Sequence, residues 1–366
     1  MEHTGDGAPL EVGLVHDYLL TMRGAERTFA AMADCWPSAP IYTTLYSADN
    51  TDGRFASRLV HTSYLQRLGV RQGGFRRLLP LYPRAVERLP VGKHDVVVSS
   101  SSAFAHGVRP KAEAIHVCYC HSPFRYAWHE RELALEEAPR LARSLLDRML
   151  TRIKRWDLEA SRRVTHYIAN SRLTQERIHA FYGREASLVH PPVDTSWLGP
   201  GTPEDFFLVV TELAPHKRVD IALQAARLAG KPIKVVGSGP ILRRLQTVFG
   251  DSAEFLGRVS SEQLADLYSG ALALVVPNVE EFGIAAVEAQ GAGRPVVALN
   301  AGGARETVLD GETGVLVPDG TASAFAEVLR EVDFEAFSPT AIRDHAEKFS
   351  VQRFADQLMR EVARLA

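Results

Sequence analysis

The chain of 366 residues contains few cysteines: Cys35, Cys118 and Cys120. Three cysteines in a chain of this length do not form a disulfide framework, and the Cys118-Tyr119-Cys120 spacing is not that of a zinc site. The sequence therefore excludes a disulfide scaffold and this kind of zinc motif. A reduced compartment, the cytosol, is the default expectation.

Strong charge bias and long apolar runs are also missing. The formal net charge is -2, with 42 basic and 44 acidic residues, so bulk charge does not favour nucleic-acid binding, and no nucleic-acid motif is present. No run of about 18 apolar residues exists, so we expect no membrane-spanning helix. The first ten residues are polar and acidic, and we expect no signal peptide.

The residues that are present predict a globular α/β protein. Hydrophobic residues make up 46% and charged residues 23%, and the length suits two domains. Apolar strand patterns alternate with helical ones, which predicts parallel sheets and two doubly wound domains. Residues 189–205, which contain several Gly and Pro residues, break this periodicity. We place domains at 1–194 and 206–349, a linker at 195–205 and a C-terminal helix at 350–366.

The most informative stretch of the second domain spans residues 277–295. It follows an apolar run at 271–276 that predicts a buried strand, passes through an acidic loop and enters a short helix. Glu280 precedes the helix and Glu288 lies on it, about two turns in. This order of strand, polar loop and helix N-terminus is typical of an anion and ligand site in α/β proteins.

Neighbouring loops of the second domain narrow the chemistry. Gly237 and Gly239 resemble a dinucleotide fingerprint, but Leu242 stands where the third glycine would fall, which disfavours a nicotinamide dehydrogenase. Cations and backbone donors at a helix N-terminus suit a diphosphate, and carboxylates accept hydrogen bonds from sugar hydroxyls. The loops therefore predict a nucleotide-sugar site; its cations and helix-start residues are Lys217, Arg218, Gly283, Ile284 and Ala285.

Two loops of the first domain are weaker candidates for ligand binding. Gly24 lies just before a predicted helix, where it would allow close approach of a ligand and where an anion is favoured; a plain turn explains it equally well. His121 follows a predicted strand at 115–119, at the sheet edge where open α/β sheets bind ligands. A structural histidine is the alternative there.

Residues 64–94 interleave basic and apolar side chains. Such a segment can lie on an anionic membrane surface. The alternative, a solvated helix face with core contacts, is favoured about two to one.

On these motifs the sequence resembles the retaining glycosyltransferases of family four, which adopt the GT-B fold. The resemblance rests on the Glu280 and Glu288 pair within Glu-Glu-Phe-Gly-Ile and Val-Glu-Ala, and on the turn at 213–220. The His16-Asp17 start and the segment 119–128 resemble a bacterial subgroup often assigned as mannosyltransferases of polysaccharide assembly. The family implies two Rossmann-like domains with the donor cleft between them and a C-terminal helix that crosses back to the first domain.

The resemblance also implies roles for single residues. Lys217 would neutralise the donor diphosphate with help from Arg218, Glu288 would bind the ribose, and Glu280 would hold hydroxyls of the transferred sugar. Glu280 and Glu288 would then not be a hydrolase acid–base pair. The remaining donor-side or catalytic assignments are Gly24 and Gly283 to Ala285 at the leaving phosphate, His121 beside the sugar, Val259 near the base, and Phe282.

The function implied is retaining, metal-independent transfer of a hexose, first of all mannose from GDP-mannose, to a glycan, lipid-linked or natural-product acceptor, with no cofactor. A UDP-sugar donor is the first alternative. Glu212 stands where many family members carry an arginine, which raises a second alternative, a pseudo-enzyme that binds a nucleotide or glycan as a partner. The expected location is cytoplasmic, with a peripheral position at the inner membrane if residues 64–94 contact lipid.

Overall fold

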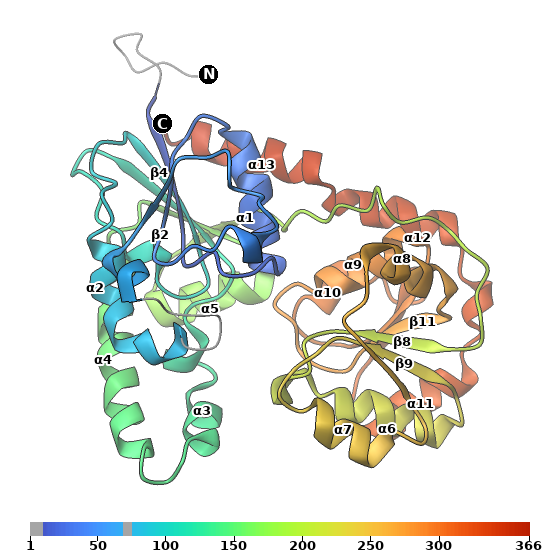
Figure 1. Ribbon diagram of the computed structural model, residues 1–366. Coiled ribbons are helices and arrows are strands. Elements are labelled where there is room, and N and C mark those ends of the chain that lie inside the picture. Colours follow the sequence, from blue (N-terminus) through green and yellow to red (C-terminus); the bar gives the residue numbers. More distant parts are fainter. Residues whose placement is uncertain (1–9, 69–74) are drawn as a thin grey trace. The chain divides into compact units, whose positions relative to one another are not determined.

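The computed structural model describes residues 10–68 and 75–366. The chain forms two compact units (Figure 1). The first extends to His190 and includes Phe354–Ala366, and the second is Pro191–Arg353. Among the described residues no helix is long and apolar enough to cross a membrane.

In its described residues the first unit has a seven-stranded parallel sheet with the order β3-β2-β1-β4-β5-β6-β7. Its strands are β1 Val12–His16, β2 Ile41–Thr43, β3 Val60–Thr62, β4 Val96–Ser101, β5 Ile115–Cys120, β6 His166–Ala169 and β7 Ala186–Leu188. Its helices are α1 Gly24–Cys35, α2 Tyr82–Glu87, α3 Arg131–Glu137, α4 Arg143–Ser161, α5 Arg172–Tyr182 and the final α13 Val351–Ala363.

Alternating strand residues of the first unit pack on the two faces of its sheet, as expected for a parallel sheet covered on both sides. Val15 and Val97 face a cluster that includes residues of α2 and α4. Leu14 and Val98 face a second cluster, which α1 and α13 cover. Figure 1 shows α1 and α13 next to each other. The last helix of the chain therefore belongs to the core of the first unit; its buried residues are Phe354, Leu358 and Val362.

The second unit has a six-stranded parallel sheet with the order β10-β9-β8-β11-β12-β13. Its strands are β8 Phe207–Val210, β9 Ile233–Val236, β10 Glu254–Gly257, β11 Ala273–Val276, β12 Val296–Leu299 and β13 Gly314–Val317. Its helices are α6 Val219–Ala229, α7 Leu242–Phe249, α8 Ser261–Gly270, α9 Ile284–Gly291, α10 Ala304–Thr307, α11 Ala322–Glu331 and α12 Pro339–Ala346. Helices α6 and α11 cover one face, whereas α8 and α9 cover the other.

Two segments of the first unit are broken into shorter helices. The segment 130–163 is divided into α3 and α4, because Ala138 before Pro139 adopts an extended conformation that ends α3. The described part of residues 64–94 forms two 3-10 segments, Tyr64–Leu68 and Phe75–Leu81, before the short α2. Residues 69–74 of this segment, including Arg71, lie outside the described residues.

Candidate functional site

The sheet of the second unit reverses its winding between β8 and β11. From β8 the chain builds β9 and β10 on one side, and it then returns to add β11, β12 and β13 on the other. Open α/β sheets bind ligands beyond the carboxyl ends of the strands at such a reversal. The loops 211–218 and 277–283 leave β8 and β11 at this point.

A lysine and a glutamate from these two loops form an ion pair. The Lys217 ammonium nitrogen lies 2.8 and 2.7 Å from the two carboxylate oxygens of Glu280. The Asn278 amide donates a further hydrogen bond of 3.0 Å to the same carboxylate. The Lys217 and Glu280 side chains are 19% and 20% exposed, so a ligand can reach both. The cation and the carboxylate expected at a diphosphate and a sugar are therefore in direct contact.

Gly283 begins the helix beside this pair. Its φ of 97° and ψ of 62° are in the left-handed region that favours glycine, and it provides no capping side chain for α9. The helix of Ile284–Gly291 directs its positive end towards this loop. The Gly303 N–H donates to the Glu280 carbonyl at 2.9 Å. A Cβ on Gly303 would lie 2.3 Å from the Phe282 backbone, so only glycine permits this close packing.

Phe282 precedes Gly283, and its side chain points into the core. Its side chain is 3% exposed and packs against Phe349, with ring centroids 5.3 Å apart. It belongs to a core cluster with Val287 and Ala346. Only the backbone of Phe282 is therefore available to the loop surface.

Glu288 is buried on α9, with 6% exposure. The Tyr268 hydroxyl of α8 donates a 2.8 Å hydrogen bond to its carboxylate. Tyr268 is itself fully buried, so it fixes the direction of the carboxylate. The sequence did not indicate Tyr268 or Asn278 as site residues. Tyr268 lies outside the motifs, and Asn278 lies within the stretch 277–295 but has no distinguishing signal there.

The glycines at 237 and 239 serve loop packing. A Cβ on Gly237 would lie 1.8 Å from the Thr211 carbonyl oxygen, and a Cβ on Gly239 would lie 2.2 Å from that of Leu213. The loop after β9 thus packs directly against the loop after β8.

The other expected donor residues occupy nearby loops. Arg218 adopts a left-handed backbone (φ 48°) before α6, and its guanidinium lies 3.5 Å from Asp220. Val259 follows β10, and its side chain packs partly buried against the α8–α9 face. Glu212 is half-buried, and its carbonyl accepts from the Ala214 N–H at 2.8 Å.

The sheet of the first unit reverses its winding between β1 and β4. Asp17 follows β1, and its carboxylate accepts backbone hydrogen bonds from Ser102, Phe104 and Ala105 at 2.6, 2.7 and 2.6 Å. Burial raises the pKa of Asp17, and these hydrogen bonds oppose the rise. Asp17 therefore organises the loop after β4.

His121 follows β5 and is buried, with 9% exposure. Its Nε2 lies 2.8 Å from the Ser100 hydroxyl, which also lies 3.0 Å from Nδ1 of His16. Gly24 is the first residue of α1, and its carbonyl accepts from the Thr28 hydroxyl at 2.9 Å. Gly24 and His121 thus belong to the first unit, whereas the other expected site residues belong to the second.

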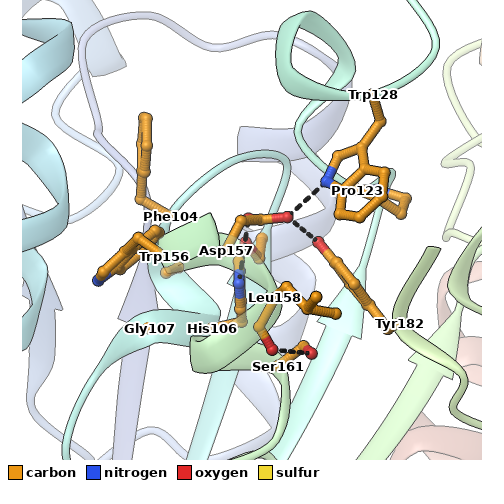
Figure 2. Close-up of polar contacts among 12 residues, drawn as sticks. Phe104, His106, Gly107, Pro123, Trp128, Trp156, Asp157, Leu158, Ser161 and Tyr182 are labelled. Atoms are coloured by element: carbon orange, nitrogen blue, oxygen red, sulfur yellow. Dashed lines mark hydrogen bonds and ion pairs between the residues drawn. The ribbon is translucent and has the colours of Figure 1, made fainter. Parts of the chain in front are cut away.

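A second polar cluster of the first unit surrounds Asp157 of α4, which is fully buried (Figure 2). Trp128 and Tyr182 each donate a 2.7 Å hydrogen bond to one carboxylate oxygen. The other oxygen lies 3.3 Å from Nε2 of His106. Asp157 therefore connects α4 to α5 and to the loops that follow β4 and β5.

Two family models match consecutive parts of the chain. "Glycosyltransferase Family 4" matches residues 22–197, and "Glycosyl transferases group 1" matches residues 198–335. Together they account for both α/β units, so the chain belongs to the family four, group 1 glycosyltransferases. This confirms the family resemblance.

Several curated relatives share one name. D-inositol 3-phosphate glycosyltransferase of Mycolicibacterium smegmatis is 33% identical over 226 residues, which are 54% of this chain and 52% of that protein. The protein of the same name from Geodermatophilus obscurus is 33% identical over 301 residues, 73% of this chain and 59% of that one. The chain thus spans about half the length of the first curated relatives that it matches.

Solved structures confirm the GT-B fold. An Anabaena HepE structure in complex with UDP and glucose has a TM-score of 0.71 at 18% identity, covering 97% of this chain and 100% of that one. Sucrose-phosphate synthase from Thermosynechococcus elongatus has a TM-score of 0.69 at 17% identity, with 97% and 98% covered.

Proposed function

We propose that this protein is a retaining glycosyltransferase that transfers a hexose from a nucleoside diphosphate sugar without a divalent metal or other cofactor. The observation that carries the proposal is the Lys217–Glu280 ion pair at the winding reversal of the second unit. It unites a phosphate-binding cation with a hydroxyl-binding carboxylate, as a nucleotide sugar requires.

The Lys217–Glu280 pair indicates how a donor would bind. A diphosphate carries more negative charge than a carboxylate, so it competes for Lys217, and the positive end of α9 at Gly283 attracts the same charge. Glu280, once separated from the ammonium group, accepts hydrogen bonds from sugar hydroxyls. Fixed cations and backbone dipoles then stabilise the leaving phosphate as charge develops on it.

The other donor contacts follow from the second unit and from the family. Glu288, oriented by Tyr268, accepts hydrogen bonds from the ribose hydroxyls. Arg218 assists at the phosphates, and the Val259 backbone lies near the base. In the first unit, Gly24 allows approach to the leaving phosphate, and His121 acts beside the transferred sugar.

The donor base and the acceptor are separate parts of the proposal. The subgroup resemblance favours GDP-mannose, whereas HepE structures contain UDP or UDP-glucose, which makes a UDP-sugar the principal competitor. The acceptor is a glycan, a lipid-linked molecule or a small natural product. Inositol 3-phosphate joins the acceptor panel because of the name of the relatives.

The decisive test is release of nucleoside diphosphate from a panel of GDP- and UDP-sugars with EDTA present, together with these acceptors. We expect release from one donor class and formation of a product that retains the anomeric configuration. Lys217→Ala should lower kcat/KM at least 100-fold, since it removes a charge-assisted contact to the transition state. Lys231→Ala, which changes a lysine just before the amino end of β9, away from the carboxyl ends of the strands, should leave the rate unchanged. No release from any donor would refute the proposal.

Glu212 supports a second candidate, a nucleotide- or glycan-binding pseudo-enzyme, because it places a carboxylate where many family members have an arginine. Calorimetric binding of a nucleotide without turnover on the full panel would favour this candidate. If Glu280→Ala and Lys217→Ala abolish sugar transfer, the pseudo-enzyme is excluded.

We also propose a cytoplasmic location with peripheral contact to the inner membrane surface through the described part of residues 64–94. Much of its apolar content is buried in the core, including Leu65, Tyr82 and Val86, but Leu68 and Leu81 are 55% and 40% exposed. Exposed leucines near arginines suit an anionic lipid surface. Flotation with anionic vesicles at low salt should recover the protein in the lipid fraction, and recovery in the soluble fraction would end this proposal.

A further inference from the structure

Three consecutive serines at the end of β4 each contact a buried histidine. Ser99 lies 2.9 Å from His116, and Ser101 lies 3.2 Å from His106. Ser100 lies between them in sequence, so its side chain points to the opposite face of the sheet. On that face the Ser100 hydroxyl lies 2.8 Å from Nε2 of His121 and 3.0 Å from Nδ1 of His16.

The chain His16–Ser100–His121 joins three adjacent strands. His16 ends β1 and pairs in register with Ser100 of β4, and His121 follows the next strand, β5. The three residues are 2%, 0% and 9% exposed. The His16 ring stacks on Phe29 of α1, with centroids 4.7 Å apart. Ser100 is thus held in the sheet between two rings that cannot move freely.

The backbone of His121 is fixed as well. Its N–H donates to the Ser101 carbonyl at 2.8 Å, and its carbonyl accepts from the Thr174 hydroxyl at 3.1 Å. The His121 and Tyr119 rings make a T-shaped contact, with centroids 5.2 Å apart. Ser100 restricts the rotation of the imidazole further, because it engages Nε2 at 2.8 Å.

The serine also couples the tautomers of the two rings. A neutral imidazole has one donor and one acceptor nitrogen, and a hydroxyl has a single proton to donate. If Ser100 donates to His121, His16 must donate to Ser100; if Ser100 donates to His16, His121 must donate to Ser100. Burial and the neighbouring His121 lower the pKa of His16 to about 3, so His16 stays neutral at ordinary pH.

We propose that Ser100 and His16 are positioning residues that hold the His121 imidazole in one orientation and one tautomer for sugar transfer. The inference rests on the proposed function, in which His121 acts beside the sugar. Preorganisation of a catalytic group by fixed neighbours is a large part of its effect on rate. The Nε2 atom is occupied by Ser100, so this nitrogen holds the ring in place and does not contact substrate.

The first test measures the tautomer directly and needs no activity. In ¹⁵N-labelled protein, the imidazole nitrogen shifts of His121, assigned by loss of its signals in His121→Asn, should show one dominant tautomer. Ser100→Ala should change that tautomer or produce a mixture. Ser99→Ala is the matched control: it removes a buried serine–histidine contact of similar length from the same strand and should leave the His121 signals unchanged.

The second test measures turnover. Ser100→Ala should lower kcat about 10- to 100-fold with KM for the donor changed less than about threefold, whereas Ser99→Ala should retain kcat. Unchanged His121 shifts in Ser100→Ala, or equal kcat values for the two variants, would overturn the inference. Absence of transfer by the wild type would refute the proposed function instead, and the tautomer measurement would still decide the inference.

Discussion

At the scale of single residues, the candidate site depends on partners that the sequence does not reveal. The signature identifies Glu280 and Glu288, but the Lys217 contact to Glu280 joins residues 63 positions apart. Tyr268 and Asn278 complete the two carboxylate environments, and nothing in the sequence marks them as the partners of Glu288 and Glu280. Pairwise geometry of this kind arises from the tertiary fold, so one sequence without its fold does not show it.

The first residue-scale prediction concerns Tyr268. Tyr268→Phe removes the hydroxyl that donates to Glu288, and a lost hydrogen bond of this kind costs about 1 to 1.5 kcal/mol. We expect nucleoside diphosphate binding to weaken about 5- to 10-fold in isothermal calorimetry. Tyr167→Phe, a change in a buried tyrosine of the first unit, should leave binding unaltered. Equal affinity of Tyr268→Phe and wild type would show that Glu288 needs no such orientation.

The second residue-scale prediction concerns the pH dependence of stability. Burial lowers the pKa of His116 to about 3. Between pH 6.5 and 3 the unfolded chain binds a proton at this position and the folded chain does not, so stability falls as pH falls. From pH 7.5 to 5 this loss is about 2 kcal/mol, because pH 5 is about 1.5 units below the unfolded pKa.

Urea denaturation of His116→Gln isolates this contribution from other titrating groups. Glu26 acts in the opposite direction, since burial raises its pKa to about 7. The stability advantage of wild type over His116→Gln should therefore shrink by about 2 kcal/mol between pH 7.5 and 5. A constant difference between the two proteins would contradict the prediction.

At the scale of elements, strong apolar strands were predictable and short or interrupted elements were not. Strands such as β4 and β11 have runs of Val and Leu that predict buried parallel strands. The three-residue strands β3 and β7 lie at the sheet edges, and their sequences Val60–Thr62 and Ala186–Leu188 are too short for a periodicity to appear. The break at Pro139 could have been predicted from its restriction on the preceding residue.

The element-scale prediction concerns Asp157, which connects α4 to α5 and to two loops. Asp157→Ala leaves buried donors of Trp128 and Tyr182 without this acceptor, so we expect a loss of about 3 kcal/mol in the free energy of unfolding. Glu159→Ala, an exposed change on the same helix, should cost less than about 0.5 kcal/mol. Similar denaturation midpoints for both variants would show that Asp157 does not hold these elements together.

At the scale of the whole molecule, the regular alternation of strands and helices predicted two doubly wound units, and the family models and GT-B structures confirm this class. The family resemblance implied that the last helix returns to the first unit, whereas the alternation of strands and helices did not. Its residues Phe354, Leu358 and Val362 repeat every fourth position, which predicts an apolar face but not the surface it contacts.

The molecule-scale prediction tests this return of the chain. Leu358 is fully buried in the core of the first unit, so Leu358→Ala should cost about 3 kcal/mol through lost burial and a cavity. Met359→Ala, at the next position and 39% exposed, should cost about 0.5 kcal/mol or less. Chemical denaturation followed by tryptophan fluorescence measures both, and an unperturbed Leu358→Ala would place α13 outside that core.

The central claim is that the Lys217–Glu280 pair at the β8–β11 reversal receives the diphosphate of a nucleotide sugar. Calorimetric titration of GDP and UDP into wild type, Lys217→Ala and Lys231→Ala, with EDTA present, tests it most directly. We predict that one nucleoside diphosphate binds the wild type and Lys231→Ala equally and binds Lys217→Ala at least tenfold more weakly, about 1.4 kcal/mol. Binding of neither nucleotide to the wild type, or equal binding to Lys217→Ala, would contradict the claim.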